Sequence, residues 1–217
     1  MNIASLVEAI IQKRSQMPAE SSLLVGISGI DASGKGFITS QIVEELKEYR
    51  IAVINVDGWL NLPHIRFDPA RPAENFYENA LRLDEMFERL IVPLRETRNT
   101  KVTMDYAEET GTEFSYHCYE FNDIDIILLE GIFIFKRQFV EHFDLKIWID
   151  CSFQKALERA INRVQEGLSR KETIHAYKTI YFPAQHLYFE RDAPKDAADL
   201  IFNNSSRSDS FIDCCTT

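Results

Sequence analysis

The sequence predicts an α/β domain built on a doubly wound, mainly parallel sheet, with a small β-hairpin and a helical lid. Near-continuous apolar runs recur along the chain, and such runs are typical of strands buried on both faces. Helical patterns separate most of these runs, as expected when helices cover both sides of a parallel sheet. Three of the runs end in a glycine-containing turn or an acidic residue. These ends should gather at the carboxyl edge of the sheet, where α/β proteins bind their ligands.

The amino-terminal part of the chain contains two predicted strands, three helices and a hairpin. The expected elements are an amphipathic helix at Leu6–Lys13, a strand at Leu23–Ser28, a helix at Phe37–Tyr49, a strand at Ala52–Val56, a helix at Asn75–Leu90, and a hairpin of Lys101–Asp105 with Glu113–Phe121. Apolar residues spaced three and four apart indicate the helices, and β-branched residues favour the second strand. The hairpin flanks the turn-like segment 108–112.

The carboxyl-terminal part continues the alternation of strands and helices. The expected elements are strands at Ile124–Leu129 and Leu145–Ile149, a helix at Ser152–Gln165 capped by Ser152, a helix at Thr173–Glu190 interrupted at Pro183, and a short strand at Leu200–Phe202. No linker rich in proline or glycine divides the chain. We therefore expect an N-terminal helix (1–20) packed on one domain (21–204), followed by a disordered tail (205–217) rich in Ser and Asp.

Charge and composition limit the classes of partner. The chain has 217 residues and a formal net charge of −10, which argues against nucleic acid and against acidic membrane surfaces. No segment is apolar for long enough to span a bilayer, and Met1–Arg14 lacks the features of a secretory signal. The four cysteines show no CxxC spacing, so neither a disulfide framework nor a zinc site is expected. A cytoplasmic protein, with a possible homo-oligomeric state, is the resulting expectation.

A candidate phosphate-binding loop follows the first strand. The segment Gly29-Ile30-Asp31-Ala32-Ser33-Gly34-Lys35 lies between an apolar strand and a helical pattern. In this context main-chain N–H groups and the helix N-terminus face an anion, while the lysine reaches the outer phosphates of a nucleotide. The predicted nucleotide-binding residues are Gly29, Asp31, Ala32, Ser33, Gly34, Lys35, Gly36 and Phe37. The alternative is a glycine-rich turn without a ligand.

Gly36 departs from the usual motif. A Ser or Thr normally follows the lysine, and its hydroxyl binds magnesium. Mg²⁺ binds few protein groups and keeps several waters, so a water can replace the missing oxygen. The substitution makes the metal geometry uncertain, but the phosphate cradle does not depend on it.

Asp57 and Glu130 end two further strands at the same predicted edge. Phosphoryl transfer to an alcohol needs a metal near the phosphates and a carboxylate that accepts the hydroxyl proton. We therefore predict Asp57 as the catalytic base and as a metal-side residue, and Glu130 as the other metal-side acid. The alternative for each residue is the capping of a following turn.

Arginines of the predicted lid complete the candidate site. Arg159 and Arg163 are four residues apart on one helical face, and Arg170 lies in the polar segment that follows. Guanidinium groups of this kind stabilise the charge on a transferred phosphoryl group. We predict a catalytic role for Arg163 beside Asp57 and Lys35. A solvated helix face with i,i+4 ion pairs is the alternative.

Five motifs resemble the uridine kinase and phosphoribulokinase group of P-loop kinases, above all the bacterial uridine kinase-like proteins. They are ISGIDASGK (27–35), NVDGW (55–59), ILLEGIF (127–133), DLKIWIDC (144–151) and YFPAQHLYFERD (181–192), and the likeness extends from about residue 20 to 204. The resemblance implies a sheet of the P-loop NTPase type, ATP as phosphoryl donor, Mg²⁺, and a small-molecule acceptor with a primary hydroxyl. It assigns Lys35 to the phosphates, Asp57 to the base, Glu130 to the metal, and Arg159 and Arg163 to the lid.

The acceptor side of this resemblance is weaker. Authentic uridine kinases carry Ser or Thr at the position of Gly36, and their uracil contacts align near Met104 and Glu109, which cannot repeat them. Uridine or a related nucleoside is thus the default acceptor, and another hydroxylated metabolite is the competitor. A regulatory ATP-binding module without catalysis is a further alternative. A GTPase is disfavoured because the chain lacks Asn-Lys-x-Asp, and a nucleoside monophosphate kinase because Phe37 replaces an expected Thr.

Overall fold

The computed structural model describes residues 1–163 and 167–205, and it confirms the predicted α/β class. Five parallel strands form the central sheet in the order β2-β5-β1-β6-β7. They are β1 (Leu23–Gly29), β2 (Ile51–Asn55), β5 (Ile126–Gly131), β6 (Leu145–Asp150) and β7 (Leu200–Asn203). All seven positions of β1 and all six of β5 are buried. This burial explains why these two strands have no polar alternation in the sequence.

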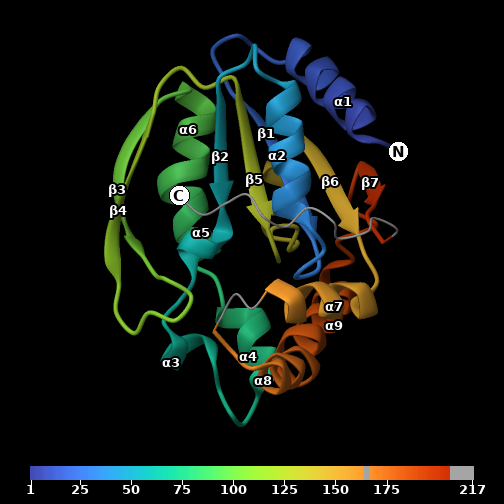
Figure 1. Ribbon diagram of the computed structural model, residues 1–217. Coiled ribbons are helices and arrows are strands. Elements are labelled where there is room, and N and C mark those ends of the chain that lie inside the picture. The colour runs from blue at the N-terminus through green and yellow to red at the C-terminus, as the bar shows by residue number, and fades with distance from the viewer. Residues whose placement is uncertain (164–166, 206–217) are drawn as a thin grey trace.

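Two separate apolar clusters cover the two faces of the sheet. Helices α1 (Ile3–Ser15) and α2 (Lys35–Glu45) bury residues such as Leu6 and Ile38 on one face, together with Val25. The preceding residue of that strand, Leu24, belongs to the other cluster, which includes residues of α4 (Pro72–Asn79), α5 (Leu83–Met86) and α6 (Val92–Thr97). Figure 1 shows α2 in front of the strands, α1 beside it at the upper right, and α6 on the left next to β2. Successive side chains of a strand point to opposite faces, so this partition produces the doubly wound arrangement.

The predicted hairpin is also confirmed. Strands β3 (Thr100–Tyr106) and β4 (Ser115–Phe121) pair antiparallel, with Met104 opposite His117. The hairpin stands beside the sheet at the edge formed by β2 (Figure 1). Its loop comes near the carboxyl ends of the parallel strands, so hairpin residues can reach the candidate site.

The single helix expected at Asn75–Leu90 is wrong. Helix α4 ends at Asn79, and α5 begins only at Leu83. Between them the chain pairs with the segment after β2: Leu81 bridges Leu60, and the Arg82 N–H donates to the Trp59 carbonyl. Contacts with a segment twenty residues away therefore override the local helical pattern.

Two prolines are accommodated inside helices by wider turns. A π-helical turn at 87–91 joins α5 to α6 shortly before Pro93, and another at 177–181 joins α8 (Arg170–Ala176) to α9 (Phe182–Asp192) before Pro183. Proline lacks an N–H, and its ring clashes with the carbonyl four residues earlier. A wider turn shifts that carbonyl, so the helix expected at Thr173–Glu190 bulges rather than breaks.

The helices of the predicted lid lie beyond the carboxyl ends of the strands. Helix α7 (Phe153–Arg163) packs against α8, and α4 packs against α9. In Figure 1 these helices form a layer below the arrowheads of the strands. The short helix α3 (Pro63–Arg66) lies at the same end. The expected helix end at 164–165 and the expected disordered tail from 206 onward fall outside the described residues.

Candidate functional site

The structure distributes the predicted residues over five segments of the chain. Gly29 ends β1; Asp31, Ala32, Ser33 and Gly34 form the loop; Lys35, Gly36 and Phe37 open α2; Asp57 lies in the 3-10 turn Val56–Trp59 after β2; Glu130 is in β5; Arg159 and Arg163 are on α7; and Arg170 opens α8. β1 and β5 are neighbours, and β5 also pairs with β2. The loop, Asp57 and Glu130 therefore occupy one edge of the sheet.

The loop between β1 and α2 has the backbone of an anion cradle. Ala32 and Gly34 adopt left-handed conformations, with φ of 53° and 91°. Left-handed residues within a turn direct successive N–H groups to one side. Gly34 is required for a second reason, since a Cβ there would lie 2.5 Å from Asn204 Nδ2. The ammonium of Lys35 donates to the Ile30 carbonyl at 3.1 Å, which holds it against the loop.

Arg159 anchors the loop from its outer side. Its guanidinium donates to the Ser33 carbonyl at 3.0 Å and to the Asn204 carbonyl at 2.9 Å. The Asn204 side-chain amide donates to the same Ser33 carbonyl at 2.8 Å. Arg159 is only 8% exposed. It thus fixes the conformation of the phosphate loop through that carbonyl.

Asn55 forms hydrogen bonds to both Asp57, the predicted base, and Glu130, the predicted metal-side acid. Its side-chain oxygen accepts the Asp57 N–H at 2.8 Å, and its amide nitrogen donates to Glu130 Oε2 at 3.0 Å. Both bonds require the same orientation of the amide, so each supports the other. Asn55 therefore positions Asp57 and Glu130 relative to each other. No local pattern predicts this role, because the hydrogen-bond partner Glu130 is 75 positions away in the sequence.

The two carboxylates share an electrostatic environment. Burial raises the pKa of Asp57 above its ordinary value, Lys35 opposes this, and Asp31 adds to it. Burial likewise raises the pKa of Glu130, against the effect of Lys35 and with that of Asp57. Glu130 is 7% exposed; Asp57 keeps solvent-accessible atoms at the edge of the site, although protein atoms surround much of its carboxylate. A raised pKa brings a carboxylate closer to the range in which it accepts a proton efficiently.

The donor atoms around Gly36 fit a hard cation. A Cβ built on Gly36 would lie 3.8 Å from Glu130 Oε2, so position 36 faces the carboxylate across ordinary contact distance. The hydroxyls of Ser33 and Thr39 are buried without a hydrogen-bond partner among the described residues. Within 1–163 and 167–205, no group of three or more His, Cys, Asp or Glu side chains could hold a metal alone. One or two carboxylates supplemented by phosphate oxygens and water is the coordination typical of Mg²⁺.

A small polar pocket of about 60 Å³ adjoins these carboxylates. Its lining residues are Asp31, Asp57, Glu109, Ala160, Arg163, Thr173 and Tyr177. Arg163 thus faces the site from the lid helix, whereas Arg170 is exposed and does not line the pocket. Of the two hairpin positions considered for the acceptor, Glu109 lines the pocket and Met104 is buried in the core. The hairpin, the loop and the lid therefore meet at this pocket.

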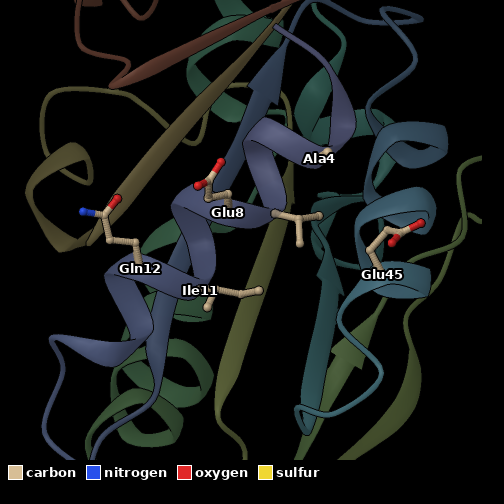
Figure 2. Close-up of a pocket in the computed structure, with 6 residues that line it drawn as sticks. Ala4, Glu8, Ile11, Gln12 and Glu45 are labelled. Atoms are coloured by element: carbon tan, nitrogen blue, oxygen red, sulfur yellow. The ribbon is translucent and has the colours of Figure 1, made fainter.

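A larger hollow of about 540 Å³ lies elsewhere, between α1 and α2. Figure 2 shows Glu8, Ile11 and Gln12 on α1 around it, with Glu45 across from them on α2. It is a shallow surface depression, far from the edge of the sheet that carries Asp57. Size alone therefore does not locate the candidate site. Among the described residues, no helix is long and apolar enough to cross a membrane.

Comparison with known proteins gives matches over most of the chain. The model of the phosphoribulokinase / uridine kinase family matches residues 24–210. A uridine kinase of Macrococcus caseolyticus is 29% identical over 202 residues, covering 89% of this chain and 94% of the relative. A uridine kinase of Staphylococcus aureus is 26% identical over 206 residues, covering 91% and 95%.

Solved structures show the same fold at lower identity. A possible uridine kinase from Bacillus stearothermophilus superposes with a TM-score of 0.72 at 18% identity, covering 93% of this chain and 100% of that chain. A putative fructose transport system kinase from a Silicibacter species gives a TM-score of 0.71 at 17% identity, covering 93% and 99%. At this identity the two similarities concern the fold alone.

Proposed function

Because the chain belongs to the phosphoribulokinase / uridine kinase family, we propose that it is an ATP-dependent kinase that phosphorylates a primary hydroxyl of a small molecule. Uridine or a related nucleoside is the default acceptor, since the curated relatives are uridine kinases. The observation that carries the proposal is the linked pair of Asp57 and Glu130 beside the phosphate loop. In this proposal the phosphate-binding N–H groups of the loop and the proton-accepting carboxylate act at the same edge of the sheet.

Each residue has a defined task in this proposal. The loop amides and Lys35 hold the phosphates, and Asp57 accepts the proton of the acceptor hydroxyl as its oxygen attacks the γ-phosphorus. Glu130, with Asp57, would hold Mg²⁺, which neutralises charge on the phosphates when it is bound. Arg163 lies near enough to lower the pKa of both carboxylates, and it would stabilise charge on the transferred group. Arg159 acts indirectly, by fixing the loop.

An activity screen tests the proposal. Protein and Mg-ATP are incubated with single nucleosides and sugar alcohols, and ADP formation is measured for each. We expect at least one acceptor to stimulate ADP release. Asp57→Asn should then lower kcat by about 10²- to 10⁴-fold, the usual contribution of a general base, with ATP affinity largely retained. Full activity of that variant would remove Asp57 from the mechanism.

A different hydroxylated acceptor, such as a sugar, is the second candidate. One observation favours it: the hairpin contributes Glu109 rather than an aromatic residue to the pocket. The third candidate, a regulatory module that binds ATP without turnover, is motivated by Gly36. That module would bind ATP and release no ADP with any acceptor.

A further inference from the structure

Asp31 is an unusual residue for a loop that binds phosphates. A carboxylate directed into the cradle would repel the anion that the loop amides attract. Its contacts turn it elsewhere: Oδ1 accepts the N–H of Ala32 at 2.8 Å, and Oδ2 accepts the hydroxyl of Tyr177 at 2.5 Å. Tyr177 belongs to the π-helical turn after α8, in the layer of helices beyond the strands. Asp31 is therefore tied to the lid side of the loop.

The same contacts place Asp31 in the pocket that contains the proposed base. Asp31 and Tyr177 line it together with Asp57. The charge of Asp31 also reaches Asp57, because it contributes to the raised pKa of that residue. An acceptor whose hydroxyl approaches Asp57 would have its neighbouring groups within reach of Asp31. Asp31 thus lies on the side of the loop that faces this pocket.

We propose that Asp31 binds a second hydroxyl of the acceptor and selects neutral polyhydroxylated molecules over anionic ones. This inference rests on the proposed kinase function and deepens its acceptor site. A carboxylate offers about four lone-pair positions, and the contacts to Ala32 and Tyr177 use two of them. A hydroxyl donor can therefore bind Asp31 without displacing Tyr177.

The charges of the pocket support the selectivity. Its lining contains three carboxylates, those of Asp31, Asp57 and Glu109, and one guanidinium, that of Arg163. Lys35 and Arg66 also act on Asp57 from outside the lining, but an acceptor bearing its own carboxylate or phosphate would meet the three lining carboxylates directly, whereas hydroxyl groups donate to them. A purely structural Asp31, which only caps the loop through Ala32, would not discriminate between acceptors.

The test compares binding of matched probes to wild type and to Asp31→Asn. Calorimetry with Mg²⁺ and an unreactive ATP analogue measures the affinity for ribose and for its acid, ribonate, and for uridine and 2′-deoxyuridine. Asparagine keeps an acceptor oxygen and the shape of the side chain but removes the charge. We expect the preference for ribose over ribonate to fall about 10- to 100-fold, the range for a hydrogen bond to a charged group. The affinity for the ATP analogue is measured beside it, because Asp31 is also a predicted nucleotide-binding residue and a loss confined to the analogue would assign Asp31 to the nucleotide instead.

Tyr177→Phe is the matched control. It removes the hydroxyl that binds Asp31 while leaving the ring, which packs edge-on against Tyr181 and Phe182. Because the Asp31 charge remains, the neutral-over-anionic preference should remain as well. A loss of that preference in Tyr177→Phe equal to that in Asp31→Asn would assign the effect to loop geometry and overturn the inference.

The remaining outcomes separate the inference from the proposed function. If the wild type binds acceptors but Asp31→Asn keeps the same preference, or loses affinity for the ATP analogue instead, the inference is wrong and the kinase proposal stands. If the wild type binds the ATP analogue and none of the four probes, the proposal for nucleoside or sugar acceptors fails together with the inference.

Discussion

Replacing Asn55 by alanine tests the link between Asp57, the proposed base, and Glu130, the proposed metal-side acid. The variant loses the bond from Asn55 to Glu130 Oε2 at 3.0 Å and the bond from the Asp57 N–H at 2.8 Å. A neutral hydrogen bond contributes about 1 kcal/mol and a bond to a charged group about 1.5–3 kcal/mol. Water replaces part of both bonds, since Asn55 is exposed. A net loss of about 1.5–3 kcal/mol in transition-state stabilisation corresponds to about a 10- to 150-fold lower kcat/KM.

The assay is steady-state ADP formation with saturating Mg-ATP and varied acceptor, accompanied by calorimetry of nucleotide binding. Nucleotide affinity should change little, because the loop and Lys35 are untouched. Asn99→Ala is the matched control: Asn99 is also exposed, accepts the N–H of Asp123 at 2.9 Å and donates to the Thr97 carbonyl at 2.7 Å. It lies outside the candidate site, so its loss should leave kcat/KM unchanged. Equal kinetic effects in the two variants would refute the reasoning, because the Asn55 effect would then be general destabilisation.

Three further predictions concern the metal side, the pH dependence and the loop anchor. Gly36→Ser should fit without displacement, since a Cβ there lies 3.8 Å from Glu130 Oε2. The added hydroxyl should lower the Mg²⁺ concentration needed for half-maximal activity. An unchanged or higher Mg²⁺ concentration would contradict a metal at this position. The raised pKa of Asp57 and Glu130 should place the acid limb of kcat/KM above the ordinary carboxyl range. The stabilisation from these raised pKa values is fully present below the unfolded-state pKa and is lost as pH rises through the folded-state pKa. In urea titrations of the ligand-free protein, Glu130→Gln should therefore remove part of the pH dependence of the free energy of unfolding. Arg159→Ala should lower the free energy of unfolding by about 2–4 kcal/mol, because a buried charged donor loses its hydrogen bonds to the Ser33 and Asn204 carbonyls and to Cys151 Sγ. Arg163 is exposed, so Arg163→Ala should lower kcat and leave stability within about 0.5 kcal/mol.

Local patterns were sufficient for the elements that depend on near neighbours. The buried strands, the hairpin and the loop before Lys35 follow from apolar runs, turn residues and glycine, and the structure has each of them. The segment 75–90 could not be predicted in the same way. Its interruption arises because Leu81 pairs with Leu60, and nothing within the segment itself marks a break.

The site shows the same division. Asp57 and Glu130 were found because each ends an apolar strand, and parallel strands bring their carboxyl ends together. The bonds of Asn55 to Asp57 and Glu130 could not be predicted, because they form only when β2 and β5 lie side by side. The spacing of Arg159 and Arg163 predicts that they share one helix face. Only the structure distinguishes them: Arg159 is buried against the loop, whereas Arg163 lines the pocket. Their catalytic and lid roles stay predictions.

The balance of charge explains how this acidic site can still serve a nucleotide. Three carboxylates, those of Asp31, Asp57 and Glu130, face three cationic groups, those of Lys35, Arg163 and Arg66. Side chains alone therefore do not neutralise a triphosphate, and the favourable contribution must come from the loop amides and the helix N-terminus, whose partial charges do not titrate. A bound divalent cation would add positive charge beside Glu130, whose pKa is raised mainly by burial. The missing hydroxyl at Gly36 thus removes one neutral ligand, while the carboxylates that attract the cation remain.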